Sequence, residues 1–216
     1  GADLTYTNVD KQFKGAPAIG NIDGDVDNEM IVGGKGKLVK YEFGAAGITS
    51  FTEITTGIPG TVNMVVLADV AGDATDEIIF SAYNDTESGV YVGSISGTTF
   101  TPLAGWPVTV NRGNVIDVPV VGDFDNDGLK EIIAFTKSMQ EAQYPGDYVF
   151  VYSNSGVIKK RFSIETNFRV ESKLLADLDG DGDLELGYKD FYDGTTRVYF
   201  KNYDGTDVVG WPKTYT

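Results

Sequence analysis

The sequence contains no cysteine and no histidine, and its 17 lysine and arginine residues are outnumbered by 32 aspartate and glutamate residues. Without cysteine and histidine the chain forms no disulfide, zinc finger, iron–sulfur site, thiol nucleophile or Ser-His-Asp triad. Transition metals usually take imidazole or thiolate ligands, so any bound metal is expected to be a hard cation held by oxygen. The net charge of −15 and the lack of a membrane-length apolar run predict neither nucleic-acid binding nor membrane insertion.

The 216 residues are 41% hydrophobic and include 27 glycines, a composition typical of a packed globular chain rather than a disordered acidic one. The chain begins Gly1-Ala2-Asp3 without methionine, which we interpret as a mature or engineered terminus that has lost any signal peptide. Of the 32 acidic residues, 17 fall in four short segments that contain one basic residue, Lys130. The negative charge is therefore concentrated in these segments, and the rest of the chain is close to neutral.

The four acidic segments are copies of one repeat. They cover residues 21–29, 69–77, 123–131 and 177–185 and are called loops one to four below. Each ends on glutamate, follows an aliphatic and a small residue, as loop three follows Val121 and Gly122, and leads into apolar residues such as Ile132 and Ile133. A chance acidic cluster would not keep this apolar frame in four places.

The segments between the loops have β-strand patterns. An apolar run leads into each loop, a second short strand follows its glutamate, and third strands with alternating aromatics are expected at 39–43, 90–95, 148–153 and 197–202. A turn containing glycine and a fourth strand complete each repeat, and no stretch has helical periodicity. Four strands in about fifty residues are typical of a propeller blade. We predict an all-β fold, a β-propeller of four-stranded antiparallel blades, with four blades in a single domain spanning residues 1–216.

The two ends of the chain both correspond to the same strand of the repeat. Residues 4–7 and 211–216 both fall where a fourth strand is expected. The chain therefore either closes as a four-bladed ring or forms part of a larger propeller, and the sequence leaves both open.

Loops three and four have the pattern D-x-D-x-D-G-x-x-E, which resembles the FG-GAP or VCBS repeats of the integrin α head and of many secreted bacterial proteins. The chain departs from that family in having only Gly15-Ala16-Pro17 as an echo of its Gly-Ala-Pro signature, and four repeats where about seven blades are usual. The resemblance implies a propeller with calcium loops on one face and ligand contacts on the opposite face.

The loops have the chemistry of a calcium cage. A hard divalent cation takes several oxygen ligands, and carboxylates at positions one, three and five, a carbonyl at seven and a carboxylate at nine can supply them. The expected ligands are Asn21, Asp23, Asp25, Asp27 and Glu29 in loop one, Asp69, Asp73, Thr75 and Glu77 in loop two, Asp123, Asp125, Asp127, Leu129 and Glu131 in loop three, and Asp177, Asp179, Asp181, Asp183 and Glu185 in loop four. An EF-hand is excluded because its position twelve would be Ala134 or Tyr188 and both flanks are strand-like.

The four loops differ in how complete these ligand sets are. Loops three and four are complete, whereas loop one has Asn21 at position one and Val26 where glycine is preferred. Loop two loses a ligand at Ala71, and its alternative interpretation is a metal-free hairpin. We expect two to four Ca²⁺ ions that mainly fasten neighbouring strands, at extracellular calcium levels. This favours a secreted or cell-surface protein.

A partner is expected on the face opposite the metal loops. Candidate contacts for a glycan or protein ligand are Arg112, Tyr144, Arg169 and Tyr192, because tyrosine and arginine on adjacent loops suit such recognition. The alternative is that they are ordinary exposed loop residues. The short basic run at 159–161 is interpreted as a solvated edge that discourages aggregation.

Catalysis without histidine or cysteine would need carboxylate pairs, tyrosine, lysine or arginine. Over half of the acids lie in the loops, so few remain for such a site. We therefore predict a non-catalytic binding or adhesion module for glycans or proteins, with calcium mainly structural. The alternative is the propeller of a carbohydrate-active enzyme such as a polysaccharide lyase.

Overall fold

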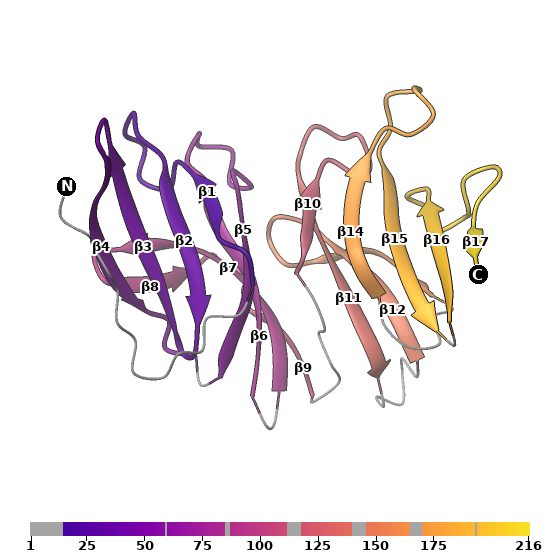
Figure 1. The fold of residues 1–216 in the computed structure, drawn as a ribbon, viewed down its shortest axis with the longest axis horizontal. Helices are drawn as coiled ribbons and strands as arrows, with labels where there is room; N and C mark the ends of the chain where they lie inside the picture. The colour runs from indigo at the N-terminus through magenta and orange to yellow at the C-terminus, as the bar shows by residue number, and fades with distance from the viewer. Residues whose placement is uncertain are drawn as a thin grey trace. The chain divides into compact units, whose positions relative to one another are not determined.

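The structure is a computed structural model, and it describes residues 15–58, 60–84, 87–111, 118–139, 146–164, 170–192 and 194–216. Every regular element in these ranges is a β-strand (Figure 1). The described residues include no helix long and apolar enough to span a bilayer. The chain divides into two compact units, Gly1–Pro119 and Val120–Thr216, and each is described by itself.

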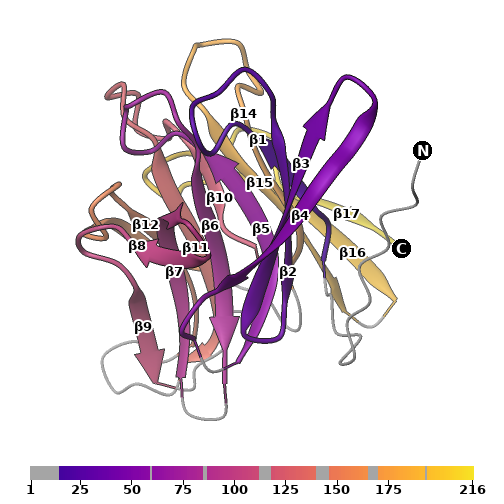
Figure 2. The ribbon, with the colours of Figure 1, turned by 90° about the vertical axis from the view of Figure 1, so that its left-hand side faces the viewer.

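Unit 1 contains two antiparallel meanders. The first is β1 (Ala18–Gly20), β2 (Glu29–Gly34), β3 (Lys37–Gly44) and β4 (Gly47–Thr55), and the second is β5 (Thr61–Ala68), β6 (Glu77–Tyr83), β7 (Glu87–Ser96) and β8 (Thr99–Pro102), with β9 (Val108–Asn111) also paired to β7. One parallel bridge, Thr55 to Thr99, joins them into a nine-stranded sheet, which curls strongly in the view of Figure 2.

Unit 2 contains two separate four-stranded antiparallel sheets. One is formed by β10 (Val120–Gly122), β11 (Glu131–Met139), β12 (Gly146–Tyr152) and β13 (Ile158–Ser163), and the other by β14 (Val170–Ala176), β15 (Glu185–Tyr192), β16 (Thr195–Lys201) and β17 (Lys213–Tyr215). The four expected third strands are β3, β7, β12 and β16. The all-β prediction is confirmed, with four consecutive four-stranded meanders.

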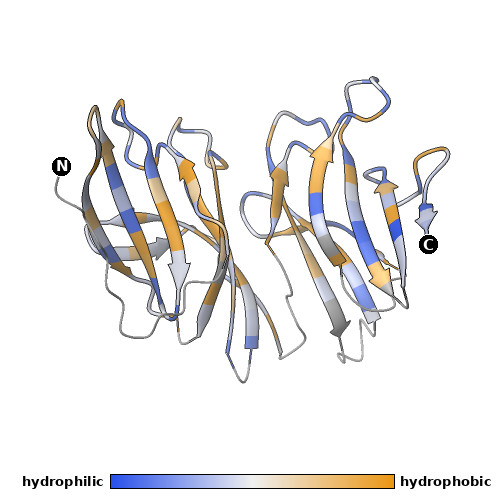
Figure 3. Ribbon diagram, in the orientation of Figure 1, coloured by the Kyte–Doolittle hydropathy of each residue, from blue (hydrophilic) through white to orange (hydrophobic). Residues whose placement is uncertain are grey.

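Burial explains why the inner strands are apolar runs and the outer strands are not. In β6 the first six residues are all buried, so both faces of the strand are covered, whereas almost every residue of β4 is exposed. Figure 3 shows the change in hydropathy from the largely apolar β2 to the more polar β3 beside it. Polar outer strands are the usual protection of an exposed sheet edge.

The small residue before each loop lies where first strands of neighbouring meanders approach each other. A side-chain carbon added at Gly20 would overlap the Asp76 carboxylate, and one at Gly122 would lie 2.8 Å from Leu175. The repeat therefore keeps a small residue at this position so that adjacent meanders can pack within each unit.

Aromatic side chains fill the two cores. In unit 1 the Phe80 ring stacks on Tyr91 with centroids 5.3 Å apart, and it contacts Phe100 at 5.1 Å. In unit 2 the Tyr188 ring stacks on Tyr199 at 4.8 Å. Each core is local to its unit, so the two meanders of a unit share the hydrophobic stabilisation.

Candidate metal centre

Each acidic loop connects the first and second strands of its meander, as the repeat predicts. Loops one and two link β1 to β2 and β5 to β6, and loops three and four link β10 to β11 and β14 to β15. The last residue of each loop is the first residue of the second strand. This places the terminal glutamate inside the protein, where it is between 0% and 3% exposed in all four loops.

The terminal glutamate closes each loop by reaching back seven residues. Its Oε2 atom accepts the backbone N–H of loop position two, at 3.0 Å from Ile22, 2.8 Å from Val70, 2.9 Å from Phe124 and 2.7 Å from Leu178. Bonds of this kind to a charged acceptor are stronger than neutral ones. Aspartate is one methylene shorter, so this contact explains why position nine is glutamate in every copy.

The aspartate at position one organises the turn in three of the loops. It accepts the backbone N–H of position six, at 3.0 Å from Ala74, 2.9 Å from Gly128 and 3.2 Å from Gly182. These three residues have φ angles of 72°, 88° and 96°, in the left-handed region that glycine adopts most easily.

Loop one has a different turn because position six is Val26. A β-branched residue strongly disfavours positive φ, and Val26 does not adopt it. The amide of Asn21 instead donates to the carbonyl oxygen of Asp25 at 2.8 Å. Loop one therefore has a different internal scaffold from the other three.

Neighbouring loops are tied together within each unit. The Asn21 N–H donates to the Asp76 carboxylate at 3.1 Å, and the Asp76 N–H donates to the Asn21 carbonyl at 2.7 Å. In unit 2 the amide of Asn126 donates to the Asp183 carboxylate at 2.7 Å. These contacts hold the two loops of each unit at the same end of their sheets.

Three groups of acids converge closely enough to hold a metal ion. Within each group one oxygen from each carboxylate lies within 4.8 Å of the others; the groups are Asp23, Glu29 and Glu42, then Asp123, Asp125 and Asp127, then Asp177, Asp179 and Glu185. Burial, followed by nearby carboxylates, raises the pKa values of Glu29 and Glu185 although each accepts a backbone N–H. A cation would offset this crowding of negative charge.

Glu42 was missed by the sequence analysis because it lies outside the nine-residue loop. It is on β3, directly opposite Glu29 in the register of β2 and β3. The hairpin between 34 and 37 sets that register, so counting back from this turn would have located Glu42.

The surroundings of the buried glutamate in loop one favour a bound cation. Glu29 is fully buried, and its Oε1 atom has no hydrogen-bond partner in the part of the chain that the structure describes. Leaving a buried charged oxygen unpaired is costly. Lys40 lies 3.5 Å from Asp23 and 2.5 Å from Glu42, at the rim of the same group.

Loop two gathers no such group among the described residues. Ala71 has no carboxylate to contribute, and its backbone N–H donates instead to Oε2 of Glu77 at 2.9 Å. Asp73 accepts from the backbone and hydroxyl of Thr75. Whether loop two binds a metal ion stays a prediction, with the metal-free hairpin as its alternative.

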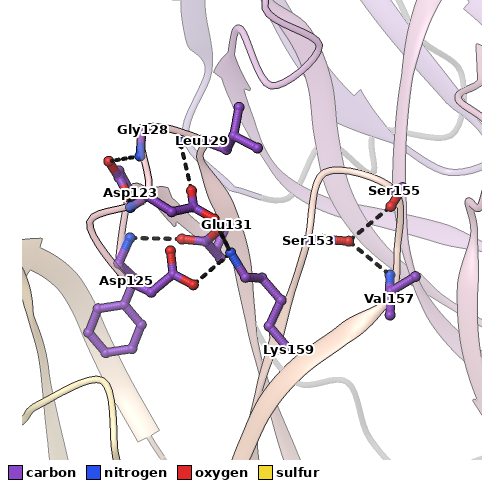
Figure 4. A network of polar contacts seen from close by, with 11 residues as sticks. Asp123, Asp125, Gly128, Leu129, Glu131, Ser153, Ser155, Val157 and Lys159 are labelled. Atoms are coloured by element: carbon purple, nitrogen blue, oxygen red, sulfur yellow. Dashed lines mark hydrogen bonds and ion pairs between the residues drawn. The ribbon is translucent and has the colours of Figure 1, made fainter.

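Loop three contains a lysine that the sequence analysis placed elsewhere. The Lys159 ammonium lies 2.6 Å from Asp125, 2.7 Å from Asp127 and 2.9 Å from Glu131 (Figure 4). Burial alone would lower the pKa of Lys159, but these carboxylates raise it well above its usual value. The interpretation of residue 159 as part of a solvated edge is therefore wrong, because its side chain points into the loop.

Among the described residues, loop four has no basic neighbour comparable to Lys40 in loop one or Lys159 in loop three. No lysine or arginine within the described ranges pairs with its acids, and a cleft of about 470 Å³ opens beside them. Asp179, Asp181 and Glu185 line this cleft together with Asn202 and Tyr203. The donor set consists of oxygen atoms, which suits a hard cation.

The expected ligand-face residues are largely beyond what the structure describes. Arg112, Tyr144 and Arg169 lie outside the described residues, and Tyr192 is the last residue of β15. Their role stays a prediction. Near that end of β15 the fully buried Asp190 lies 3.9 Å from Arg197.

Comparison with known proteins gives a fold and no family. No family model matches the chain, and no curated protein matches it. Among solved structures, the V. cholerae biofilm matrix protein Bap1 matches 89% of this chain with 19% identity and a TM-score of 0.55, and the Dos1 propeller matches 85% with 10% identity and a TM-score of 0.54. The match spans 27% of the Bap1 chain and 44% of the Dos1 chain. At these identities the similarity concerns the fold.

Proposed function

We propose that this chain is a calcium-binding portion of a β-propeller that acts outside the cell as a non-catalytic adhesion or binding module for glycans or proteins. Its four meanders would be four blades. Support comes from their common strand order, from the same loop position in each, and from the similarity of fold to the Dos1 propeller and to Bap1. Ring closure within this chain or within a longer one is compatible with this proposal.

The unpaired buried oxygen of Glu29 is the observation that carries the metal part of this proposal. It lies in the group that also contains Asp23 and Glu42. These three carboxylates would hold the ion in loop one, and Asp177, Asp179 and Glu185 would hold it in loop four. Bound calcium would supply positive charge that offsets the repulsion between these acids. Asp25, Asp181 and the carbonyls at position seven would complete the ligand sets.

The adhesion part of the proposal rests on the extracellular setting that the calcium loops favour and on the fold shared with a biofilm matrix protein. Its ligand would bind at the end of the blades opposite the metal loops. Arg112, Tyr144, Arg169 and Tyr192 remain the candidate contacts there. Calcium would have a structural role, since the loops fasten the first two strands of each meander.

Thermal unfolding of the chain with calcium and with EDTA tests the metal part. Each site filled at about 100 times its Kd adds about 2.7 kcal/mol, which for a chain of this length is roughly 5–11 °C in Tm. Asp177→Asn with Asp179→Asn should remove one ion per chain in native mass spectrometry, whereas Asp73→Asn should remove none. Equal Tm values with no retained calcium would refute calcium binding.

A glycan array and a protein-binding screen, each with calcium and with EDTA, test the adhesion part. We expect calcium-dependent retention of a ligand that is weakened by Arg169→Ala and unchanged by Lys37→Ala, whose side chain pairs with Glu53 on the outer strand. Release of unsaturated uronate from an acidic polysaccharide would instead support the lyase alternative.

A further inference from the structure

We propose that Lys159 is the resident cation of loop three, so that this loop is closed without a metal ion while loop four of the same unit takes a divalent cation. This inference rests on the proposed calcium binding, and it assigns different occupants to two loops whose sequences follow the same pattern.

The position of the ammonium group is the first argument. It contacts the carboxylates of loop positions three, five and nine, at 2.6, 2.7 and 2.9 Å. These are the same side chains that a calcium ion would need. A divalent cation would have to displace the ammonium from all three carboxylates, because two positive groups only a few ångströms apart repel strongly in a partly buried site.

The backbone explains how a residue from the outer strand reaches the loop. Val151 pairs with Lys160 and Tyr152 pairs with Ile158, which leaves Lys159 as the extra residue of a β-bulge between β12 and β13. Bulges re-aim a side chain relative to its neighbours in a strand. Lys159 is only 23% exposed and makes three ion pairs, whereas Lys160 lies over the Tyr203 ring at 5.9 Å.

Tethering allows the lysine to compete with a free ion. A group held on the same chain competes at an effective concentration on the order of millimolar or more, which matches the calcium levels outside cells at which weak calcium modules work. In loop three both oxygens of Asp123 also accept backbone N–H groups, at 3.0 Å from Asp127 and 2.9 Å from Gly128, whereas Oδ1 of Asp125 is buried with no hydrogen-bond partner among the described residues.

Loop one shows a weaker form of the same arrangement. Lys40 contacts Asp23 and Glu42 there, but Glu29 keeps an oxygen with no partner among the described residues. In loop three the corresponding glutamate, Glu131, is paired through both oxygens, to Lys159 and to the Phe124 N–H. Lys159 therefore pairs with the glutamate oxygen of loop three, whereas the corresponding oxygen of loop one has no partner among the described residues.

The test is the number of calcium ions bound by the full chain and by its Lys159→Met variant, measured by calorimetry and by native mass spectrometry. We expect the variant to bind one more ion than the wild type, and Asp125→Asn in the variant background to remove that extra ion. Lys201→Met is the matched control, because among the described residues Lys201 pairs with Asp207 and not with a loop acid, and it should leave the number unchanged.

A second measurement needs no variant. In a calcium titration of the labelled wild-type chain followed by NMR, the Gly182 amide of loop four should shift and saturate, and the Gly128 amide of loop three should not. A saturating shift of Gly128, or an unchanged number of ions in a folded Lys159→Met variant, would overturn the inference and leave calcium binding at loop four intact. If neither protein binds calcium, both the proposed function and this inference are wrong.

Discussion

Replacing Glu77 with alanine should destabilise the protein by a similar amount with and without calcium. Glu77 is 3% exposed, and its Oε2 atom accepts the N–H of Val70 at 2.8 Å and of Ala71 at 2.9 Å. The Val70 N–H is buried, so losing its charged acceptor costs about 2 kcal/mol, and the more exposed Ala71 bond adds about 1 kcal/mol. For a chain of this length the total of about 3 kcal/mol lowers Tm by roughly 6–12 °C.

The measurement is thermal and urea unfolding by circular dichroism, in EDTA and in millimolar calcium. Loop two is the right place for it because no metal-holding group of acids forms there within the described residues. Glu77→Asp keeps the charge but shortens the side chain by one methylene, so it should show most of the decrease in Tm expected for Glu77→Ala. Asp73→Ala is the control, because the contacts of Asp73 among the described residues are exposed turn contacts, and the loss of stability should be clearly smaller. A wild-type Tm for Glu77→Asp, or a loss seen only with calcium, would refute the account of glutamate as the loop closure.

Three further outcomes follow from buried residues. Burial raises the pKa of Asp190, and Arg197 offsets this shift only partly. The stabilisation from the protonated Asp190 side chain is therefore complete below its unfolded pKa and is lost as pH rises through its folded pKa. Asp190→Asn should raise Tm at neutral pH and have little effect near pH ~3, and a lower Tm at neutral pH would contradict this. Phe80→Ala removes the centre of an aromatic stack and should cost about 3–5 kcal/mol in urea unfolding. Gly93→Ala would place a carbon against the Thr101 carbonyl oxygen and should cost about 1–3 kcal/mol, whereas an unchanged Tm would mean that β7 and β8 separate easily.

The strands and the loop positions could be predicted from the sequence because their signals are local. Apolar runs such as 132–135 and the small residue before each loop recur in the same places of the repeat. Strands β10 and β11 accordingly pair on either side of loop three, with Gly122 opposite Glu131. These features depend only on neighbours along the chain.

What decides the occupant of each loop depends on residues distant in sequence. Glu42 joins loop one through the register of β2 and β3, and Lys159 joins loop three through a bulge in β13. The register can be counted from the hairpin turn, but the bulge has no signal in hydrophobic periodicity. The nine-residue pattern alone therefore treats loops three and four as equivalent, although in the described part of the chain a lysine ammonium pairs with the acids of loop three and not with those of loop four.

The glutamate closure also determines how the loops respond to an ion. Backbone N–H bonds to Glu185 and Asp177 already hold loop four in its turn, at 2.7 Å from Leu178 and 2.6 Å from Gly180. Little backbone entropy then remains to be lost when an ion arrives. At the proposed calcium site the rate of ion entry should therefore be governed by dehydration of the ion and not by ordering of the chain, and loss of the ion should leave the loop folded and able to bind again.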